Sequence, residues 1–242
     1  MNFAIPDRSN DQTGNSSKPT LMCSVSDLLV ETPEVIIDGV DGKHFKGKTN
    51  NDVKAADIYQ QKCHFFPKGT GKVFINIEAL SVSRSELRSL NKNDLQSLTK
   101  LKLIWFFSNK LTAIEPNLFV YNSILKFVDF GDNRIRSVAS DLFDPLTELE
   151  KVMFNANICI ARDGEGRSQI KDVERELYRN CKQEVKPIKD EVKPIKDEVK
   201  PNKEPEIEKE KDKQCICESD PKVLQSLAIQ LLLLIERLFK SS

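Results

Sequence analysis

The sequence predicts an α/β repeat fold, in which short strands from successive coils form one curved parallel sheet. The first observation behind this prediction is a period of 24 residues, because residues 101–124 align with residues 125–148 at their apolar positions. The second is the apolar spacing in each period, which alternates over one short stretch as in a half-buried strand. The third is an asparagine that follows this stretch at a constant distance, at Asn109, Asn133 and Asn157.

Matching pairs of residues carry the period across the two central coils. They are Leu101 and Leu125, Ile104 and Val128, Phe106 and Phe130, Asn109 and Asn133, Leu111 and Ile135, Ile114 and Val138, and Phe119 and Phe143. The match extends back to Ile77 and ends after Cys159, since Arg162 and Arg167 occupy the next apolar slots. A fixed period of this kind is typical of stacked-repeat proteins, in which single coils cannot bury their own apolar side. We therefore predict an α/β-type leucine-rich repeat solenoid, a short curved parallel sheet of about four repeats with cysteine-stapled caps.

The asparagine at the end of each strand is expected to form a ladder through the stack. Asparagine tolerates a tight turn and bonds to nearby backbone, and a sharply bent coil directs its amide inward. Removal of Asn109, Asn133 or Asn157 should leave buried polar groups unpaired, at roughly 1–3 kcal/mol each. On the return limb, a second column is expected from Leu95, Phe119 and Phe143.

The cysteines flank the repeats in pairs. Four cysteines can pair in three ways, and we interpret Cys23–Cys63 and Cys159–Cys181 as disulfides that staple the two ends of the stack. Such bonds imply an oxidising compartment, whereas the alternative is four buried reduced thiols in a cytosolic protein. Residues 1–20 contain no apolar run of the kind that a secretory leader needs. Secretion therefore implies a leader that is missing from this chain, and the alternative localisation is cytoplasmic.

The composition divides the chain into six segments. We predict a disordered tail at 1–20, an N-terminal β-rich cap at 21–76, leucine-rich repeats at 77–158 and a C-terminal cap at 159–181. Residues 182–214 contain repeats of EVKPIKD, and their prolines and balanced charges predict a disordered linker. Residues 215–242 combine Cys215-x-Cys217 with an amphipathic helix suited to a coiled coil. Its seam is Leu224, Leu227, Leu231, Leu234 and Leu238.

The C-terminal helix is too apolar to stay alone in water. It must meet a second copy, another protein, the repeats or a membrane surface, and its few basic residues (Lys222, Arg237 and Lys240) make a membrane surface an unfavourable partner. Cys215 and Cys217 are candidates for an interchain disulfide of an oligomer formed by this helix. An intrachain or adventitious pair is the alternative.

The strand positions between the inward apolar residues face the concave side of the sheet. Read down the stack, they form three columns: Ala79, Leu103, Phe127 and Lys151; Ser81, Trp105, Asp129 and Met153; and Ser83, Phe107, Gly131 and Asn155. Exposed aromatic side chains are typical of binding hot spots. We predict a partner-binding surface of Leu103, Trp105, Phe107, Phe127, Asp129 and Met153. The alternative is that the N-terminal cap or the C-terminal helix folds over this face.

The sequence contains no arrangement of residues typical of an enzyme. Cys215 and Cys217 have no second ligand pair nearby, and the only histidines are His44 and His64, so no zinc site is expected. The segment Lys68–Lys72 lacks the spacing of a phosphate loop. We expect no catalysis, no metal and no cofactor. Equal numbers of basic and acidic residues, 37 each, also give no reason to expect a nucleic-acid partner.

Several motifs around the repeats resemble a known group of proteins. They are Gly42-x-His44-x-x-Gly47, Asn51-Asp52-Val53, Cys63-His64-Phe65-Phe66-Pro67 and the Asn-x-Cys ending of the repeats. Over roughly Cys23–Cys181 these resemble secreted leucine-rich repeat proteins of dipteran insects (flies, midges and mosquitoes). With a C-terminal coiled coil, the layout is similar to the mosquito leucine-rich immune proteins of the haemolymph, which carry more repeats and longer coiled coils. The resemblance implies an extracellular, oligomerising protein that recognises protein partners in immunity; the alternative function is an intracellular scaffold or adaptor.

Overall fold

The computed structural model describes residues 2–4, 21–40 and 47–181 of the 242-residue chain. The predicted linker at 182–214, Cys215, Cys217 and the C-terminal helix with its leucine seam lie outside the described residues. The same is true of most of the N-terminal tail, although Asn2–Ala4 of the segment expected to be disordered form a strand, β1.

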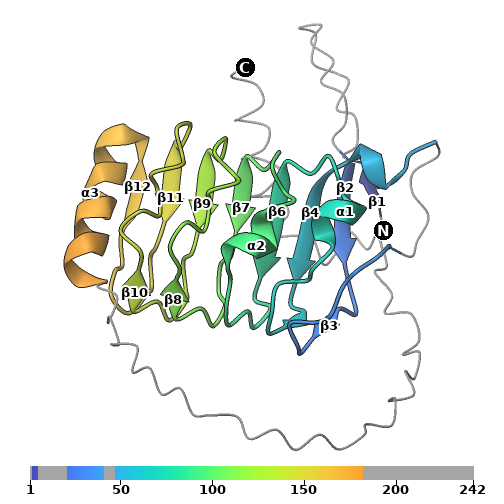
Figure 1. Ribbon diagram of the computed structural model, residues 1–242, viewed down its shortest axis with the longest axis horizontal. Coiled ribbons are helices and arrows are strands. Elements are labelled where there is room, and N and C mark those ends of the chain that lie inside the picture. The colour runs from blue at the N-terminus through green and yellow to red at the C-terminus, as the bar shows by residue number, and fades with distance from the viewer. Residues whose placement is uncertain (1, 5–20, 41–46, 182–242) are drawn as a thin grey trace, which may run out of the picture.

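The described chain forms a row of coils that share one eight-stranded sheet (Figure 1). Its strands, in spatial order, are β1 (Asn2–Ala4), β2 (Leu21–Val25), β4 (Val53–Tyr59), β6 (Ala79–Ser83), β7 (Leu103–Trp105), β9 (Phe127–Asp129), β11 (Lys151–Met153) and β12 (Asp163–Glu165). The inner pairings are parallel, whereas the pairings of β1 with β2 and of β12 with β11 are antiparallel. The α/β repeat fold with a mainly parallel sheet, predicted from the sequence, is therefore present.

The register of the sheet follows the period of the sequence. Leu103 pairs with Ala79 on one side and with Phe127 on the other, and Phe127 pairs with Lys151. Each step is one period along the chain. The same position after each strand also has a positive φ angle without being glycine, at Gln60, Arg84, Ser108, Asp132 and Ala156. Each coil thus turns away from the sheet through the same left-handed residue.

The return side of the coils contains short elements rather than long helices. The helices α1 (Thr70–Val73) and α2 (Lys92–Leu95) each form about one turn. Two small parallel sheets complete this side: β8 (Ala113–Ile114) with β10 (Ser137–Val138), and β3 (Leu29–Val30) with β5 (Lys62–Cys63). A 3-10 turn at Asn50–Asp52 precedes β4.

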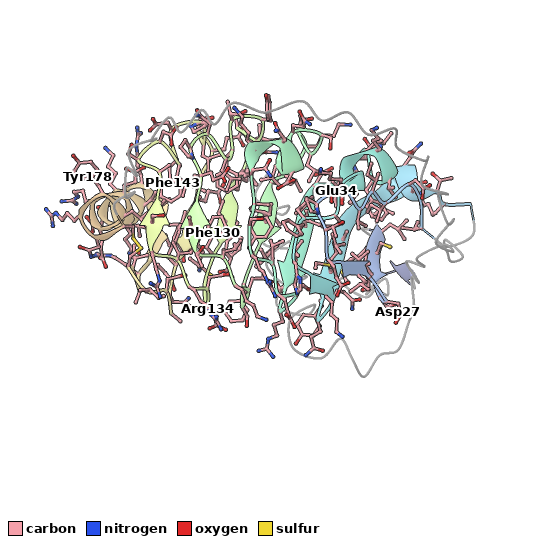
Figure 2. The ribbon with its side chains drawn as sticks, turned by 60° about the horizontal axis from the view of Figure 1, so that its bottom comes forward. Asp27, Glu34, Phe130, Arg134, Phe143 and Tyr178 are labelled. Atoms are coloured by element: carbon pink, nitrogen blue, oxygen red, sulfur yellow. A yellow bond between two sulfur atoms is a disulfide. The ribbon has the colours of Figure 1, made fainter. Side chains whose placement is uncertain are left out.

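The core lies between the main sheet and the return segments. Phe130 is central to it: its ring centroid lies 5.5 Å from that of Phe106, 5.4 Å from Phe154 and 6.2 Å from Phe119. Figure 2 shows Phe130 inside the stack, and its side chain is fully buried. The expected return-limb column of Leu95, Phe119 and Phe143 is also buried. Stacked aromatic rings from successive coils therefore join the coils into one core.

The N-terminal part of the chain continues the sheet. β4 pairs with β6 at the same period, Ala55 opposite Ala79 and Ala56 opposite Leu80, and β2 adds a further strand. The leucine pattern does not show this coil, because Ala56 occupies the place of Leu80. The segment 34–40, which resembles a strand in sequence, forms only one bridge, from Ile36 to Lys68.

A helix and a disulfide close the C-terminal end of the stack. α3 (Gly166–Asn180) buries Ile170, Val173 and Leu177 against the last coil, while Tyr178 points away from the stack (Figure 2). The predicted Cys159–Cys181 disulfide is present, with the two Cα atoms 5.2 Å apart.

The predicted Cys23–Cys63 disulfide is wrong. Cys23 is disulfide-bonded, but Cys63 lies outside that bond. The register gives the reason, because Cys23 of β2 lies opposite Ala56 in the main sheet, while Cys63 of β5 lies opposite Val30 in a small sheet. The two cysteines therefore belong to different sheets of the fold.

Candidate functional site

The face of the main sheet that points away from the core, called the concave face here after the prediction, presents the columns expected from the sequence, extended by two strands. The first column contains Met22, Ala55, Ala79, Leu103, Phe127 and Lys151. The second contains Ser24, Asp57, Ser81, Trp105, Asp129 and Met153. In a strand, alternate side chains point to the same face, so these two columns run side by side across the coils.

The middle of this face is an apolar cluster, which we call the concave cluster. Its members are Met22, Ala55, Ala79, Leu103, Trp105 and Phe127, with the partly buried Met153 packed against them. The rings of Trp105 and Phe127 are in contact, with centroids 4.9 Å apart. The structure thus brings together four of the six residues predicted for partner binding, and Asp129 lies beside Trp105 in the register.

The exposure of the concave cluster differs from the expectation. A solvated binding surface was predicted, but Leu103, Trp105 and Phe127 have exposed fractions of 1%, 7% and 3%, and Asp129 is 5% exposed. Phe107 and Met153 are half-buried. The sequence pattern identifies which side chains share this face, but it does not indicate that their tips are shielded from water.

The concave face becomes polar toward the last strands. The Gly131 N–H donates a hydrogen bond to Asp129 Oδ1 at 2.7 Å. Asp163 Oδ1 accepts hydrogen bonds from the backbone N–H groups of Phe154, at 2.9 Å, and Asn155, at 3.0 Å. A Cβ atom at residue 131 would lie 2.8 Å from Asn155 Oδ1. Glycine is therefore required there for the carboxylate and the amide to approach so closely.

Two carboxyl groups on this face are poorly solvated. Burial raises the pKa of Asp129 to about 6, against the hydrogen bond from Gly131, and the nearby Asp163 raises it further. Burial likewise raises the pKa of Asp57 to about 6, although a hydrogen bond with Ser81 lowers it. A carboxylate loses hydration when it is buried, so its neutral form is favoured.

We expect Asp129→Asn to stabilise the protein at neutral pH. Because the pKa of folded Asp129 lies above that of an unfolded aspartate, the folded state holds a proton that the unfolded state loses between about pH 4 and 6. The free energy of unfolding of the wild type should fall across that window, and the variant should lack that part of the fall. At pH 7.5 the variant should be more stable by about 1–3 kcal/mol. Urea titrations from pH 4 to 8 measure this.

The control for Asp129→Asn is Asp132→Asn, a neighbouring aspartate that is exposed. It should leave the pH dependence of stability unchanged. Asparagine at 129 can still accept the Gly131 hydrogen bond, so a loss of stability at pH 7.5 in that variant would contradict the predicted cost of the buried charge.

The predicted asparagine positions lie at the end of their strands with their amides directed into the stack. Asn109 Oδ1 accepts from Ser85 N and Leu87 N at 3.0 and 3.1 Å. Asn133 Oδ1 accepts from Leu111 N, and Asn157 Oδ1 from Ile135 N, each at 3.1 Å. The amide nitrogens donate to the preceding coil at Val82 O, Phe106 O and Phe130 O. Each asparagine therefore links two adjacent coils.

The ladder also contains residues that the asparagine pattern does not reveal. Ser85 takes the asparagine position one coil earlier, and its hydroxyl oxygen accepts from Gln61 N at 3.1 Å. Gln61 in turn accepts from Leu28 N through Oε1 at 2.8 Å. On the return side, the buried Asn122 donates to Leu95 O and Leu98 O. The only sequence signal for Asn122 is that it stands in phase with the apolar Leu98 and Leu146.

The described residues offer no centre for metal chemistry. Within 2–4, 21–40 and 47–181, no three His, Cys, Asp or Glu side chains form a group that could hold a metal ion. No helix in this part of the chain is long and apolar enough to cross a bilayer.

Comparisons with known proteins find similarity to solved structures alone. No protein-family model matches the chain, and no curated protein matches it significantly. The structure is similar to the complex of Toll and Spätzle, a molecular hub in Drosophila development and innate immunity, at 20% identity and a TM-score of 0.42. The glycosylated form of that complex gives 20% identity and 0.43. The leucine-rich repeat domain of APL1 gives 12% identity and 0.40.

These similarities are partial in length. The match to each form of the Toll complex covers 44% of this chain and 14% of that chain. The match to APL1 covers 56% of this chain and 43% of that chain. This chain therefore spans less than half the length of each of these proteins, and the repeat fold is assigned from its own coils.

Proposed function

We propose that this protein is a non-enzymatic leucine-rich repeat protein that recognises another protein through its concave face. The observation that carries the proposal is the concave cluster, with the Trp105 and Phe127 rings in contact at its centre. A sheet face that meets only water is normally lined by polar residues. Large aromatic side chains on such a face are typical of the centre of a protein interface.

The surroundings of the concave cluster fit the same function. Partly exposed polar residues, Lys151 and Asn155, continue the columns on β11 and after it. Protein interfaces commonly have an apolar centre and a polar rim. Asp129, which accepts a hydrogen bond from the Gly131 N–H, lies at the boundary between the two and would add specificity to such an interface.

The extracellular location is supported by the Cys159–Cys181 disulfide, because such bonds persist in oxidising compartments. Contact of residues 215–242 with another apolar surface is supported by the leucine spacing of that segment. That surface is a second copy if the protein oligomerises through this segment. An innate-immune role is supported by the resemblance of the motifs that flank the repeats. The alternative is an intracellular scaffold, and thiol titration of the denatured protein from its natural source distinguishes them: six reactive thiols favour the scaffold.

Photo-crosslinking tests the recognition surface. Phe107 is half-buried in the third concave column, whereas Tyr121 is exposed on the return side of the same coil. A photoreactive phenylalanine analogue is introduced at position 107 or at position 121, and each variant is irradiated in fluid from the compartment where the protein resides. The variant at 107 should form covalent adducts with other proteins, and the variant at 121 should form few. Equal adducts at both positions, or adducts at 121 alone, would show that recognition uses another surface.

A further inference from the structure

The shielding of the concave cluster is greater than a bare sheet face allows. Met22, Ala55, Ala79 and Leu103 are each no more than 2% exposed, and Phe127 is 3% exposed. Side chains that stand on one face of a sheet shield the flanks of their neighbours but leave their tips accessible. Such low exposure therefore requires a layer over the tips.

The described residues do not supply this layer. The apolar residues in contact with the concave cluster all belong to the strands of the sheet, from β2 to β11. The apolar residues of the return segments belong instead to the core on the other side of the sheet. Within the part of the chain that the structure describes, no apolar element is packed over the concave cluster.

Polar groups on the same face are also shielded. The Ser24 hydroxyl is buried and has no hydrogen-bond partner among the described residues. Ser81 and Ser83 are buried and their hydroxyls lie 3.0 Å apart, satisfying each other. Burial also raises the pKa of Asp57 and Asp129. A layer that removes water from hydroxyls and carboxylates without bonding to all of them is itself apolar.

We propose that residues 223–240 of this same chain form a helix that packs its leucine seam across the concave cluster. The described chain ends at Cys181, and 223–240 is the long apolar stretch beyond it: only Glu236, Arg237 and Lys240 are charged there. The tail at 5–20 is rich in Ser, Asn and Asp and contains no such stretch. The C-terminal segment therefore has the chemistry that the shielded face requires.

The dimensions of the segment and the sheet agree. An eighteen-residue helix is about 27 Å long. Strands lie about 4.8 Å apart, so the concave cluster from β2 to β11 measures about 24 Å across. Residues 182–214 connect the end of the described chain at Cys181 to the C-terminal segment, and a flexible chain of this length has an end-to-end distance of about 30 Å. The segment can therefore reach the face and cover its full width.

A cysteine pair can attach the segment at the β2 end. Cys23 of β2 is disulfide-bonded, and Cys159 and Cys181 bond to each other. Cys215 and Cys217 immediately precede the apolar segment. Cys23 lies on the core side of β2, whereas Met22 lies on the concave side. A bond from Cys23 to Cys215 or Cys217 would hold residues 215–217 at the β2 end of the sheet, and the helix that follows would pass around this end to run over Met22 toward β11.

The fluorescence of Trp105 tests the proposal directly, because it is the only tryptophan in the chain and lies in the concave cluster. The full chain should emit at short wavelength and resist quenching by acrylamide. Substitution of two seam leucines, Leu227→Asp and Leu231→Asp, should shift the emission to longer wavelength and increase the quenching constant several-fold. Far-UV circular dichroism checks that the repeats remain folded.

The matched control is Gln225→Asp with Gln230→Asp, which adds the same charge to the same segment outside the seam. It should leave the emission and quenching of Trp105 as in the wild type. If the seam variant is folded and its Trp105 is as protected as in the control, another segment covers the face and the proposal is wrong.

Three further measurements need no seam variant. After cleavage within 182–214 and reduction, the fragment containing 223–240 should co-elute with the repeats in gel filtration; separate elution with Trp105 still protected would overturn the proposal. Sedimentation of the intact chain gives its oligomeric state at each concentration, and acrylamide quenching at the same concentrations gives the protection of Trp105. Trp105 should be protected in the monomer, and protection found only in a dimer would assign the face to a second copy.

Peptide mapping under non-reducing conditions identifies the partner of Cys23. It should join Cys23 to Cys215 or Cys217, whereas a bond to Cys63 would remove the proposed attachment at the β2 end. The helix and a protein partner cannot occupy the concave cluster together, so recognition through this face requires the helix to leave it. None of these readouts involves a partner protein, so a failure of this proposal is distinguishable from a failure of the recognition function.

Discussion

Substitution of Asn109 by alanine is expected to lower the free energy of unfolding by about 3–5 kcal/mol, one of the two largest effects predicted here. Its Oδ1 accepts from Ser85 N and Leu87 N, and its Nδ2 donates to Val82 O at 2.7 Å and Phe106 O at 3.0 Å. Alanine would leave these backbone groups without partners inside the stack. Urea unfolding followed by far-UV circular dichroism measures the loss.

Two other asparagines provide the comparison for Asn109. Asn93 is exposed on α2, and among the described residues its backbone N–H bonds to Asn91 Oδ1 while its side-chain amide has no partner. Asn93→Ala should therefore change stability by less than about 0.5 kcal/mol. Asn157 occupies the ladder position in the last coil and is only half-buried, so Asn157→Ala should have an intermediate effect. Equal stability of the variants at 109 and 93 would show that the ladder contributes nothing to the fold.

Substitution of Phe130 by alanine is expected to cost about 3–5 kcal/mol as well, for a different reason. Phe130 is fully buried and its ring contacts those of Phe106 and Phe154, one coil away on each side. Truncation would leave a cavity where three coils meet, and short coils cannot collapse far into it. The midpoint and slope of urea unfolding at constant pH give the cost.

Controls for Phe130→Ala lie in the same region of the fold. Tyr121 is an exposed aromatic residue of the neighbouring coil, and Tyr121→Ala should be close to neutral. Phe143 lies nearer the end of the stack and contacts one ring, that of Phe154, at 6.2 Å, so Phe143→Ala should cost less than Phe130→Ala. A larger loss for Phe143 would mean that the last coils, and not the middle of the aromatic row, dominate stability.

The central coils could be predicted from sequence because burial selects residues at fixed positions there. Between 101 and 157 the inward positions of the main-sheet strands are apolar, and each of these strands is followed by an asparagine at the same distance. The coil that contains β4 is less evident, since Ala55 and Ala56 occupy two of its strand positions. It joins the sheet through backbone hydrogen bonds, which any residue except proline can make.

The cysteines show a second limit of sequence reasoning. Cys159–Cys181 could be predicted because the second cysteine ends a helix that closes the last coil. Cys23 and Cys63 likewise stand on the N-terminal side of the repeats in sequence, but both lie in strands, and whether two cysteines meet depends on register. A shift in pairing moves a side chain to another corner of the coil, and the spacing of cysteines along the chain does not report it.

The sequence by itself determined the period of this protein, the residues that face inward, the columns of the concave face and the Cys159–Cys181 disulfide. These follow from local alternation and from the need of each coil to bury one side, and both are visible in a single chain. Only the tertiary structure decided that the sheet includes β2 and β4, that Cys23 does not meet Cys63, and that the concave cluster is shielded from water. These depend on which distant segments come together, because shielding and register are properties of packed neighbours and not of any one segment.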